Sequence, residues 1–173
     1  MTSDILIRKA RSDEHAALGQ MLVSAYAALP GMPTVDEQPD YYATLAGVAG
    51  RAARPSWTVF VARESAGELL GSIDFIEDMQ HYGSGGSAVT ITDAAGVRFL
   101  AVNDAHRGKG AGKALTNFCI ARARALGKAR LVLHTTRAMT SAWALYEGLG
   151  FVRFPEIDFR QGELEVFGFQ LRW

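Results

Sequence analysis

The spacing of apolar and polar positions divides the chain into short strands and amphipathic helices. Alternation with period two, or a short apolar run between turn residues, predicts a strand, whereas apolar residues three and four positions apart predict a helix. The strands predicted in this way are Ile5–Ile7, Trp57–Arg63, Leu69–Phe75, Val97–Val102, Arg130–Thr135, Phe151–Phe154 and Glu165–Leu171. The predicted helices are Asp13–Leu29, Tyr41–Ala53, Gly110–Leu126 and Thr140–Leu149.

The order of these elements predicts a mixed sheet. In the first half, Trp57–Arg63 and Leu69–Phe75 are separated by a short turn that contains Gly67, which is typical of an antiparallel hairpin. In the second half, strands alternate with helices, as in parallel crossovers. We therefore expect a single α/β (α+β mixed) domain over residues 1–173, with a strongly twisted sheet of about seven strands and about four flanking helices.

Composition and charge narrow the classes of function. The chain has 173 residues, with 18 basic and 18 acidic side chains and a formal net charge of zero. A neutral chain lacks the positive field that non-specific nucleic-acid binding needs, and no apolar run approaches the length of a membrane span. The single cysteine, Cys119, excludes an internal disulfide and reads as a small buried hydrophobe of a helix. We expect a soluble cytoplasmic protein without nucleic-acid or membrane partners.

The stretch Val97–Leu115 carries the clearest candidate chemistry. An apolar strand leads into Arg107-Gly108-Lys109-Gly110-Ala111-Gly112 and then into a predicted helix. Backbone N–H groups converge where a glycine-rich turn enters a helix, and the positive end of the helix dipole adds to them. The sequence therefore predicts a phosphate site at this turn.

Two common phosphate motifs do not fit the turn. A P-loop would place its leading glycine at Arg107 and its Ser or Thr at Ala114, and a dinucleotide fingerprint would place its third glycine at Lys113. The pattern that fits is R-x-x-G-x-[GA], with Arg107, Gly110 and Gly112 in place. Downstream, Ala142–Phe151 reads A-x-x-x-Y-x-x-x-G-F.

In these two motifs and in the order of its elements, the chain resembles the GNAT superfamily of acetyl-CoA-dependent N-acetyltransferases. The resemblance implies acetyl-CoA as cosubstrate, with its pyrophosphate at the turn and its pantetheine arm along an unpaired edge of the strand before it. The implied coenzyme-binding residues are Leu100, Ala101, Val102, Arg107, Gly108, Lys109, Gly110, Ala111, Gly112 and Lys113. It also implies direct transfer of the acetyl group to an amine, with Tyr146 as the general acid for the departing thiolate.

Two positions depart from the family's pattern. Arg98 stands where many members carry a glutamate base, and an arginine cannot accept the proton. Asp74, Glu77, Asp93, His134 and an ordered water are the alternative bases. Met139 stands where the family often has an asparagine that contacts the arm, and Trp143 either covers the arm or packs in the helix.

The acceptor is predicted less sharply than the donor. By resemblance, the acceptor pocket would use Tyr26, Tyr41, Tyr42, Trp57, Asp74, Glu77, His81 and Tyr82, an aromatic and partly acidic set that suits a cationic amine. The partners expected are a small-molecule amine or a peptide, with a homodimer left open, and the four histidines lack the spacing of a metal site. A coenzyme-A-binding sensor without activity, transfer of another acyl group, and transfer to a hydroxyl remain alternatives.

Overall fold

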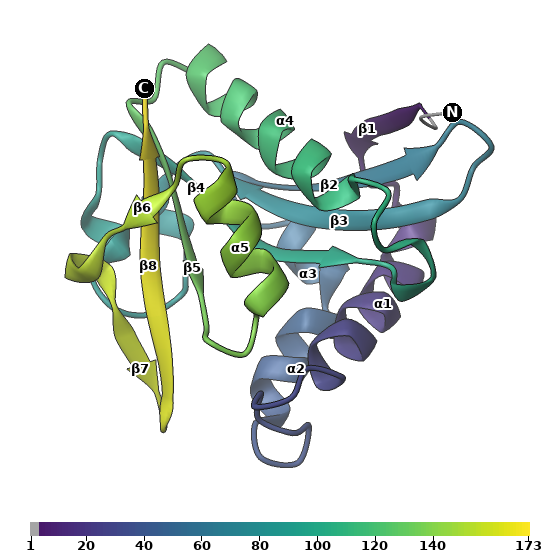
Figure 1. Ribbon diagram of the computed structural model, residues 1–173, viewed down its shortest axis with the longest axis horizontal. Helices are drawn as coiled ribbons and strands as arrows, with labels where there is room; N and C mark the ends of the chain where they lie inside the picture. The colour runs from purple at the N-terminus through teal and green to yellow at the C-terminus, as the bar shows by residue number, and fades with distance from the viewer. Residues whose placement is uncertain (1–3) are drawn as a thin grey trace.

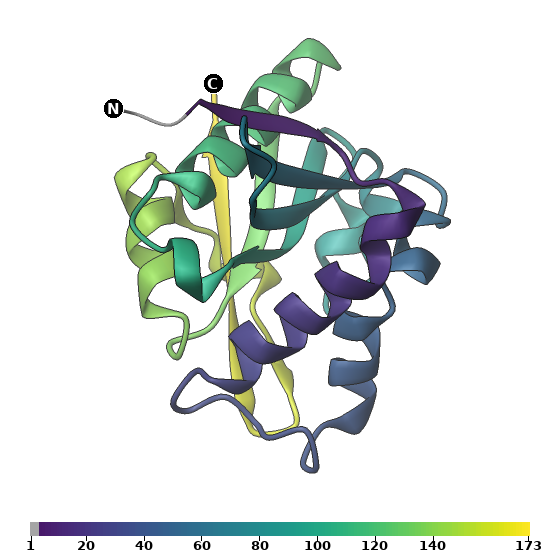
Figure 2. The same cartoon turned by 90° about the vertical axis from the view of Figure 1, so that its right-hand side faces the viewer.

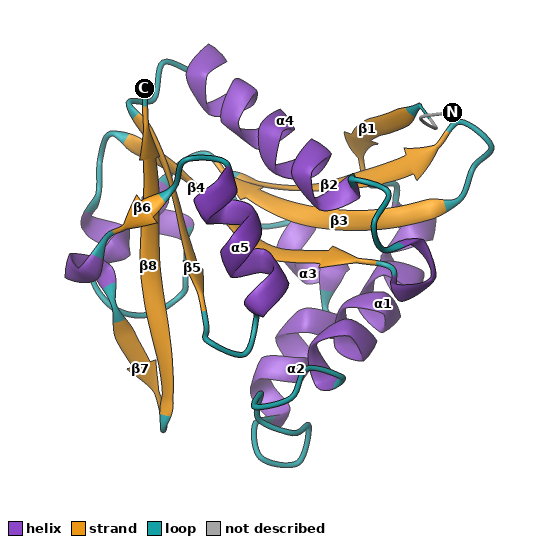
Figure 3. Cartoon of the chain, viewed as in Figure 1, coloured by secondary structure: helices purple, strands orange, loops and turns teal. Residues whose placement is uncertain are grey.

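The computed structural model describes residues 4–173 and shows helices packed on both faces of a twisted sheet (Figures 1 and 3). The strands are β1 (Ile5–Lys9), β2 (Trp57–Glu64), β3 (Leu69–Ile76), β4 (Ala94–Val102), β5 (Arg130–Thr135), β6 (Val152–Arg153), β7 (Phe159–Gln161) and β8 (Leu164–Arg172). The α-helices are α1 (His15–Ala27), α2 (Pro39–Ala46), α3 (Val48–Ala52), α4 (Ala111–Ala125) and α5 (Thr140–Gly148).

The sheet is mixed, as the element order predicts. Its strands follow the order β1-β2-β3-β4-β5-β8-β6, and β7 pairs with β8 off this path. The β4–β5 pair is parallel, and the other pairs among the described strands are antiparallel. The predicted α/β fold class is therefore confirmed.

Each face of the sheet has its own apolar core. Helices α1, α2 and α3 cover one face, and α4 lies on the other (Figure 2). Leu18, Leu45 and Val61 belong to the first core, whereas Leu70, Leu115 and Leu131 belong to the second. These leucine and valine side chains are fully buried, so the two cores fix the sheet between the helices.

The largest differences between the predicted and the observed elements lie at three places. The predicted helix Tyr41–Ala53 is two helices, because the backbone leaves the helical region at Gly47 (φ −80°, ψ 50°). Strand β4 starts at Ala94 rather than Val97, since small residues pair there although they carry little strand propensity. The short strand β7 is missed by the prediction, and its turn into β8 contains Gly162 with φ 63°.

Strands β4 and β5 are paired over only a short length. Their ladder comprises Ala94↔Arg130, Ala95↔Leu131 and Gly96↔Val132. Beyond Gly96, β4 continues beside β3, whereas β5 continues beside β8 as far as Thr135↔Phe167 (Figure 1). The two central strands thus separate, and beyond Gly96 the edge of β4 that faces β5 has no strand partner among the described residues.

A β-bulge shapes the other edge of β4. Ser72 pairs with Ala101 and Asp74 with Arg98, so two residues of β4 lie opposite the single residue Ile73. Phe99, inside the bulge, has φ 55°, a left-handed conformation that costs a non-glycine residue about 1–3 kcal/mol. The bulge interrupts the alternation of side chains, and the Arg98 guanidinium lies 4.3 Å from the centroid of the Phe99 ring.

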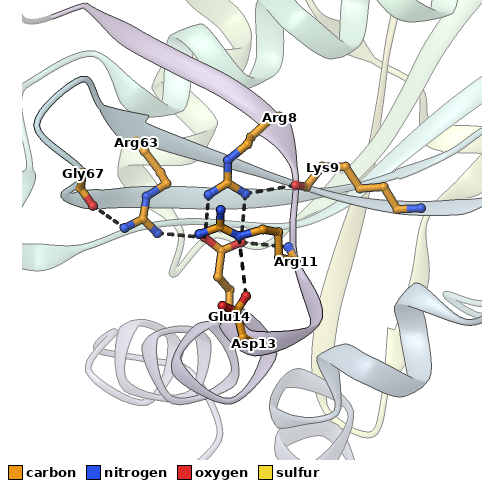
Figure 4. A network of polar contacts seen from close by, with 7 residues as sticks. All are labelled: Arg8, Lys9, Arg11, Asp13, Glu14, Arg63 and Gly67. Carbon is orange, nitrogen blue, oxygen red and sulfur yellow. Dashed lines mark hydrogen bonds and ion pairs between the residues drawn. The ribbon is translucent and has the colours of Figure 1, made fainter.

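A polar network joins the first strand to the first helix (Figure 4). The Glu14 carboxylate accepts hydrogen bonds of 2.6 and 2.9 Å from Arg8, 2.9 Å from Arg63 and 2.8 Å from the Arg11 backbone N–H. The hydrogen bonds from Arg8 lower the pKa of Glu14 to about 2, against the opposing effect of burial. This nearly buried carboxylate therefore holds β1, β2 and the start of the α1 segment together.

Replacing Glu14→Gln is expected to lower the free energy of unfolding at pH 7 by up to about 3 kcal/mol. The folded pKa lies below the ordinary value, so this stabilisation is present above about pH 4.5 and is lost as the pH falls toward 2. Urea unfolding at several pH values measures both effects. Glu165→Gln, which removes an exposed ion pair to Arg160, is the control and should change little. Equal stability of Glu14→Gln and wild type at pH 7 would contradict the role of this network.

Candidate functional site

A cavity of about 520 Å³ lies where β4 and β5 separate. Its walls come from α1 and the loop after it, β4, the glycine turn, the end of β5, α5 and the β7–β8 hairpin. Its lining includes Tyr26, Leu29, Met32, Tyr41, Tyr82, Ser84, residues 97–102, Arg107, Gly108, residues 110–113, His134, Thr135, Met139, Leu145, Tyr146, Phe159, Gln161 and Val166. Segments far apart in the sequence thus meet in one cavity.

The glycine turn leaves its backbone open at one end of the cavity. Gly108 (φ 81°) and Gly110 (φ 85°) are left-handed, and a Cβ built on either would meet no atom within 4 Å. Gly110 is the N-cap of the 15-residue helix α4. The first N–H groups of this helix have no partner within it and carry the positive end of its dipole. The turn can therefore hold an anion, beside the cationic side chains of Arg107 and Lys113.

Nine of the ten predicted coenzyme-binding residues line the cavity. They are Leu100, Ala101, Val102, Arg107, Gly108, Gly110, Ala111, Gly112 and Lys113. Lys109 does not line it, because its Nζ lies 2.7 Å from Glu64 Oε1 and 3.1 Å from His106 Nδ1. The Lys109 side chain thus points away from the cavity.

The unpaired edge of β4 presents backbone groups to the cavity. Asn103 N–H donates to Leu70 O on β3, at 2.8 Å. Backbone groups alternate between the two edges of a strand, so those of Leu100 and Val102 face the gap instead. The Tyr26 hydroxyl donates to Leu100 O at 2.9 Å. The remaining groups of Leu100 and Val102 can pair with an extended ligand, as an added strand would.

Tyr146 on α5 is a buried phenol at the wall of this cavity. It is only 5% exposed, and its ring packs on Phe151 with centroids 5.7 Å apart. Burial raises the pKa of Tyr146 above its ordinary value, so the hydroxyl keeps its proton at neutral pH. Within residues 4–173 this hydroxyl has no hydrogen-bond partner, and it is therefore available as a donor to a ligand.

The four candidate bases differ in their position relative to the cavity. Asp74 is fully buried away from the cavity, with Oδ2 2.7 Å from Arg51 Nε; burial raises its pKa and Arg51 opposes that change. Glu77 and Asp93 are exposed and also lie outside the cavity lining. His134 is the one candidate of the four that lines the cavity.

His134 has a defined tautomer. Its Nε2 lies 2.8 Å from Ile157 O, and since a carbonyl can only accept, Nε2 carries the proton. Its Nδ1 therefore accepts the Tyr82 hydroxyl, 3.0 Å away. The Tyr82 ring is held against Gly96, where a Cβ would lie 2.7 Å from two ring carbons. Burial lowers the pKa of His134 to about 4, so the imidazole is neutral at pH 7.

Arg98 extends from the bulge into the cavity wall. Its Nη1 donates to Tyr82 O at 3.2 Å, and its guanidinium lies 5.7 Å from the Tyr82 ring centroid. Burial lowers the pKa of Arg98, while Tyr82, Tyr41 and Asp74 oppose that change. Among the described residues no carboxylate forms an ion pair with it.

Three of the eight residues predicted for the acceptor pocket, Tyr26, Tyr41 and Tyr82, line the cavity. Tyr42, Trp57, Asp74, Glu77 and His81 do not, and among residues 4–173 no Asp or Glu belongs to the lining, in contrast to the partly acidic set that was expected. Tyr42 instead donates to Pro33 O at 2.6 Å, and the Trp57 indole donates to His81 O at 2.7 Å.

Several cavity residues were not predicted. Leu29 and Met32 come from the end of α1 and the following loop, and Phe159 and Val166 come from the β7–β8 hairpin. Gly162, flanked by residues that alternate in polarity, was the one sequence signal for that hairpin.

Met139 and Trp143, which the sequence analysis considered as contacts of the pantetheine arm, differ in their position relative to the cavity. Met139 lines the cavity, and its Sδ lies 3.5 Å from Thr135 Oγ1. Trp143 packs on Phe167 and Phe169 outside the lining.

Cys119 is fully buried, and burial raises the pKa of its thiol, which disfavours the nucleophilic thiolate. In the described chain, no cluster of three His, Cys, Asp or Glu residues could hold a metal ion.

Comparison with known proteins finds a family match that covers most of the chain. Residues 19–151 match the model of the acetyltransferase (GNAT) family. A search of curated protein sequences finds no significant match. Over residues 4–173, no helix combines the length and apolarity that crossing a membrane requires.

Solved structures of low sequence identity share the fold. The PaiA N-acetyltransferase of Thermoplasma acidophilum, in complex with coenzyme A, has a TM-score of 0.73 at 13% identity, covering 98% of this chain and 99% of that one. YncA of Salmonella typhimurium, with its cofactor acetyl-CoA, has a TM-score of 0.66 at 23% identity, with coverages of 97% and 93%. Spermidine N-acetyltransferase of Vibrio cholerae, with coenzyme A and spermine, has a TM-score of 0.63 at 18% identity, with coverages of 97% and 95%.

The imidazole of His134 is expected to titrate near pH 4 rather than near 6.5, with its proton on Nε2 above that pH. The folded pKa lies below the ordinary one, so the contribution of this residue to stability is full above about pH 6.5 and declines as the pH falls to about 4. NMR titration of the histidine ring signals measures the midpoint, and loss of one signal in His134→Gln assigns it. A midpoint near 6.5 would contradict the buried, neutral state.

Proposed function

The chain belongs to the acetyltransferase (GNAT) family, and on that basis we propose that it transfers the acetyl group of acetyl-CoA directly to a primary amine. The observation that carries the proposal is the meeting of three features in one cavity: an open glycine turn, an unpaired strand edge and a buried tyrosine without a hydrogen-bond partner. Each feature corresponds to one part of the reaction.

The residues of the turn suit the coenzyme pyrophosphate. A Cβ on Gly108 or Gly110 would meet no atom within 4 Å, and the first N–H groups of α4 have no partner within the helix. Arg107 and Lys113 add positive charge. Lys109 takes part through its backbone alone, because its side chain is paired with Glu64. The free backbone groups of Leu100 and Val102 then pair with the amides of the pantetheine arm.

Transfer requires a neutral amine to attack the thioester carbonyl. A backbone N–H of the separated β4 edge stabilises the negative charge that develops on the carbonyl oxygen. Tyr146 then donates its phenolic proton to the departing thiolate, and the raised pKa of Tyr146 keeps that proton in place until then. The products are coenzyme A and an N-acetylated amine.

The amine must lose a proton before or during attack. Asp74, Glu77 and Asp93 lie outside the cavity, which leaves His134 and ordered water as acceptors of that proton. His134 is a weak base, because its pKa is about 4 and its Nε2–H is bonded to the Ile157 carbonyl oxygen. We therefore assign the proton to ordered water, while His134 Nδ1 and the Tyr82 hydroxyl hold each other in place.

Gly110→Glu is expected to weaken acetyl-CoA binding by at least roughly 30-fold, or about 2 kcal/mol, because it places a side chain and a negative charge at the anion site. Isothermal titration calorimetry measures the affinity. Gly127→Glu is a matched control: Gly127 follows the other end of α4, has φ 77°, and a Cβ there would also meet no atom within 4 Å. Equal affinity in Gly110→Glu and wild type would overturn the pyrophosphate assignment.

Tyr146→Phe is expected to lower turnover by roughly 100-fold, since general-acid catalysis is lost, while acetyl-CoA affinity stays at the wild-type value. Thiol release against a panel of amines measures turnover. Tyr42→Phe removes the hydroxyl of a buried tyrosine outside the cavity and should keep wild-type turnover. Acetyl-CoA binding without thiol release by the wild type, for every amine, would instead favour a coenzyme-binding sensor.

A further inference from the structure

The charges that line the cavity are all positive. Its lining contains no Asp or Glu, and its cationic side chains are Arg98, Arg107 and Lys113. Arg107 and Lys113 belong to the glycine turn, whereas Arg98 lies four residues before the end of β4. At about 3.3 Å per residue, that separation is roughly 13 Å. One cation therefore lies far from the proposed phosphate site, toward the end of the cavity where an extended arm along β4 would finish.

Among the described residues Arg98 has no ion-pair partner, although it is only partly exposed. Its cross-strand neighbour Asp74 carries a carboxylate, but this carboxylate is bound to Arg51 at 2.7 Å. The Arg51–Asp74 pair is neutral overall, so the charge of Arg98 is not compensated by it. A buried charge without a partner is costly, and an anion supplied by a ligand would compensate it.

The Arg98 guanidinium is held in a defined position with donors to spare. One N–H donates to Tyr82 O, and the plane lies over the Phe99 ring at 4.3 Å. The φ of 55° at Phe99 places that ring beneath the guanidinium. The Arg98 Nε and Nη2 groups have no partner among the described residues. A fixed guanidinium with free donors suits the two oxygens of a carboxylate.

The walls around Arg98 are aromatic and uncharged. The Tyr82 and His134 rings lie with centroids 5.6 Å apart and planes tilted by 35°, and His134 meets the edge of Phe159 at 5.1 Å. His134 is neutral at pH 7, since its pKa is about 4. Tyr41 adds a further ring at the same wall. These surfaces suit an apolar or aromatic body.

We propose that the acceptor is a small amino carboxylate with an apolar side chain, such as an amino acid, whose carboxylate binds Arg98. This inference rests on the proposed acetyl transfer and names its substrate class. A polyamine is disfavoured, because its additional ammonium groups would meet a cation and no carboxylate in the cavity. The spermidine enzyme of Vibrio cholerae shares the fold, but that likeness does not carry its acceptor to this chain.

The test compares each amino acid with its own C-terminal amide, which lacks the negative charge, and includes spermidine as a polyamine. Thiol release is measured with the full chain and acetyl-CoA, using L-methionine, L-phenylalanine, the C-terminal amides of both, and spermidine. In the wild type, kcat/KM should be at least about tenfold higher for each acid than for its amide. In Arg98→Gln that ratio should fall to about one, chiefly through a higher KM for the acid, while acetyl-CoA affinity stays unchanged. Arg98→Lys should retain part of the preference.

Arg54→Gln is the matched control, because Arg54 also stacks on an aromatic ring, at 5.0 Å from Trp57, but is exposed and outside the cavity. It should keep the preference for the acids. Higher kcat/KM for the amides or spermidine, or a preference for the acids that survives in Arg98→Gln, would overturn the inference and leave acetyl transfer intact.

Absence of thiol release with every amine would overturn the proposed function instead. In that case the inference is tested by binding alone, measured by calorimetry with coenzyme A present. The N-acetylated acids should bind the wild type more tightly than the corresponding N-acetylated amides. That difference should vanish in Arg98→Gln, and its absence in the wild type would count against the carboxylate site.

Discussion

The separation of β4 from β5 after Gly96 is the constraint on which the rest of the site depends. Three parallel residue pairs join β4 to β5 at one end. Beyond these pairs, among the described strands, β4 pairs only with β3 and β5 pairs only with β8, so the two strands diverge. The cavity, its unpaired backbone edge and the access of Tyr146 to that edge all follow from this divergence. A continuous ladder would have filled the same space with hydrogen bonds between the strands.

The bulge in β4 complements this separation on the opposite edge. It keeps β4 paired with β3 while it moves Phe99 and Arg98 out of regular alternation. Its strain is offset by packing, since Phe99 lies beside Trp57 and Tyr41 in the first core. The two cavity ends therefore have different origins: a helix N-terminus at one end, and a distorted strand at the other.

Local patterns in the sequence were sufficient to predict the glycine turn at the cavity but not the rest of its lining. Arg107, Gly110 and Gly112 are close in sequence, and their turn chemistry can be read from spacing. Met32, Tyr82, His134 and Phe159 also line the cavity, but they lie on segments with no common periodicity. Asp74 was misplaced for the same reason: alternation along β3 does not reveal that Arg51 of α3 covers it.

Arg98 also bears on how the amine becomes reactive. Like charges disfavour one another, so an ammonium group that enters beside a guanidinium loses its proton more readily than it does in water. A side chain that cannot itself accept a proton would thereby raise the share of neutral nucleophile at the thioester. An acceptor bound through its carboxylate compensates the guanidinium at the same time and so cancels most of this effect. For such an acceptor Arg98 would position the amine, whereas for an amine without a carboxylate it would favour the neutral form and oppose binding.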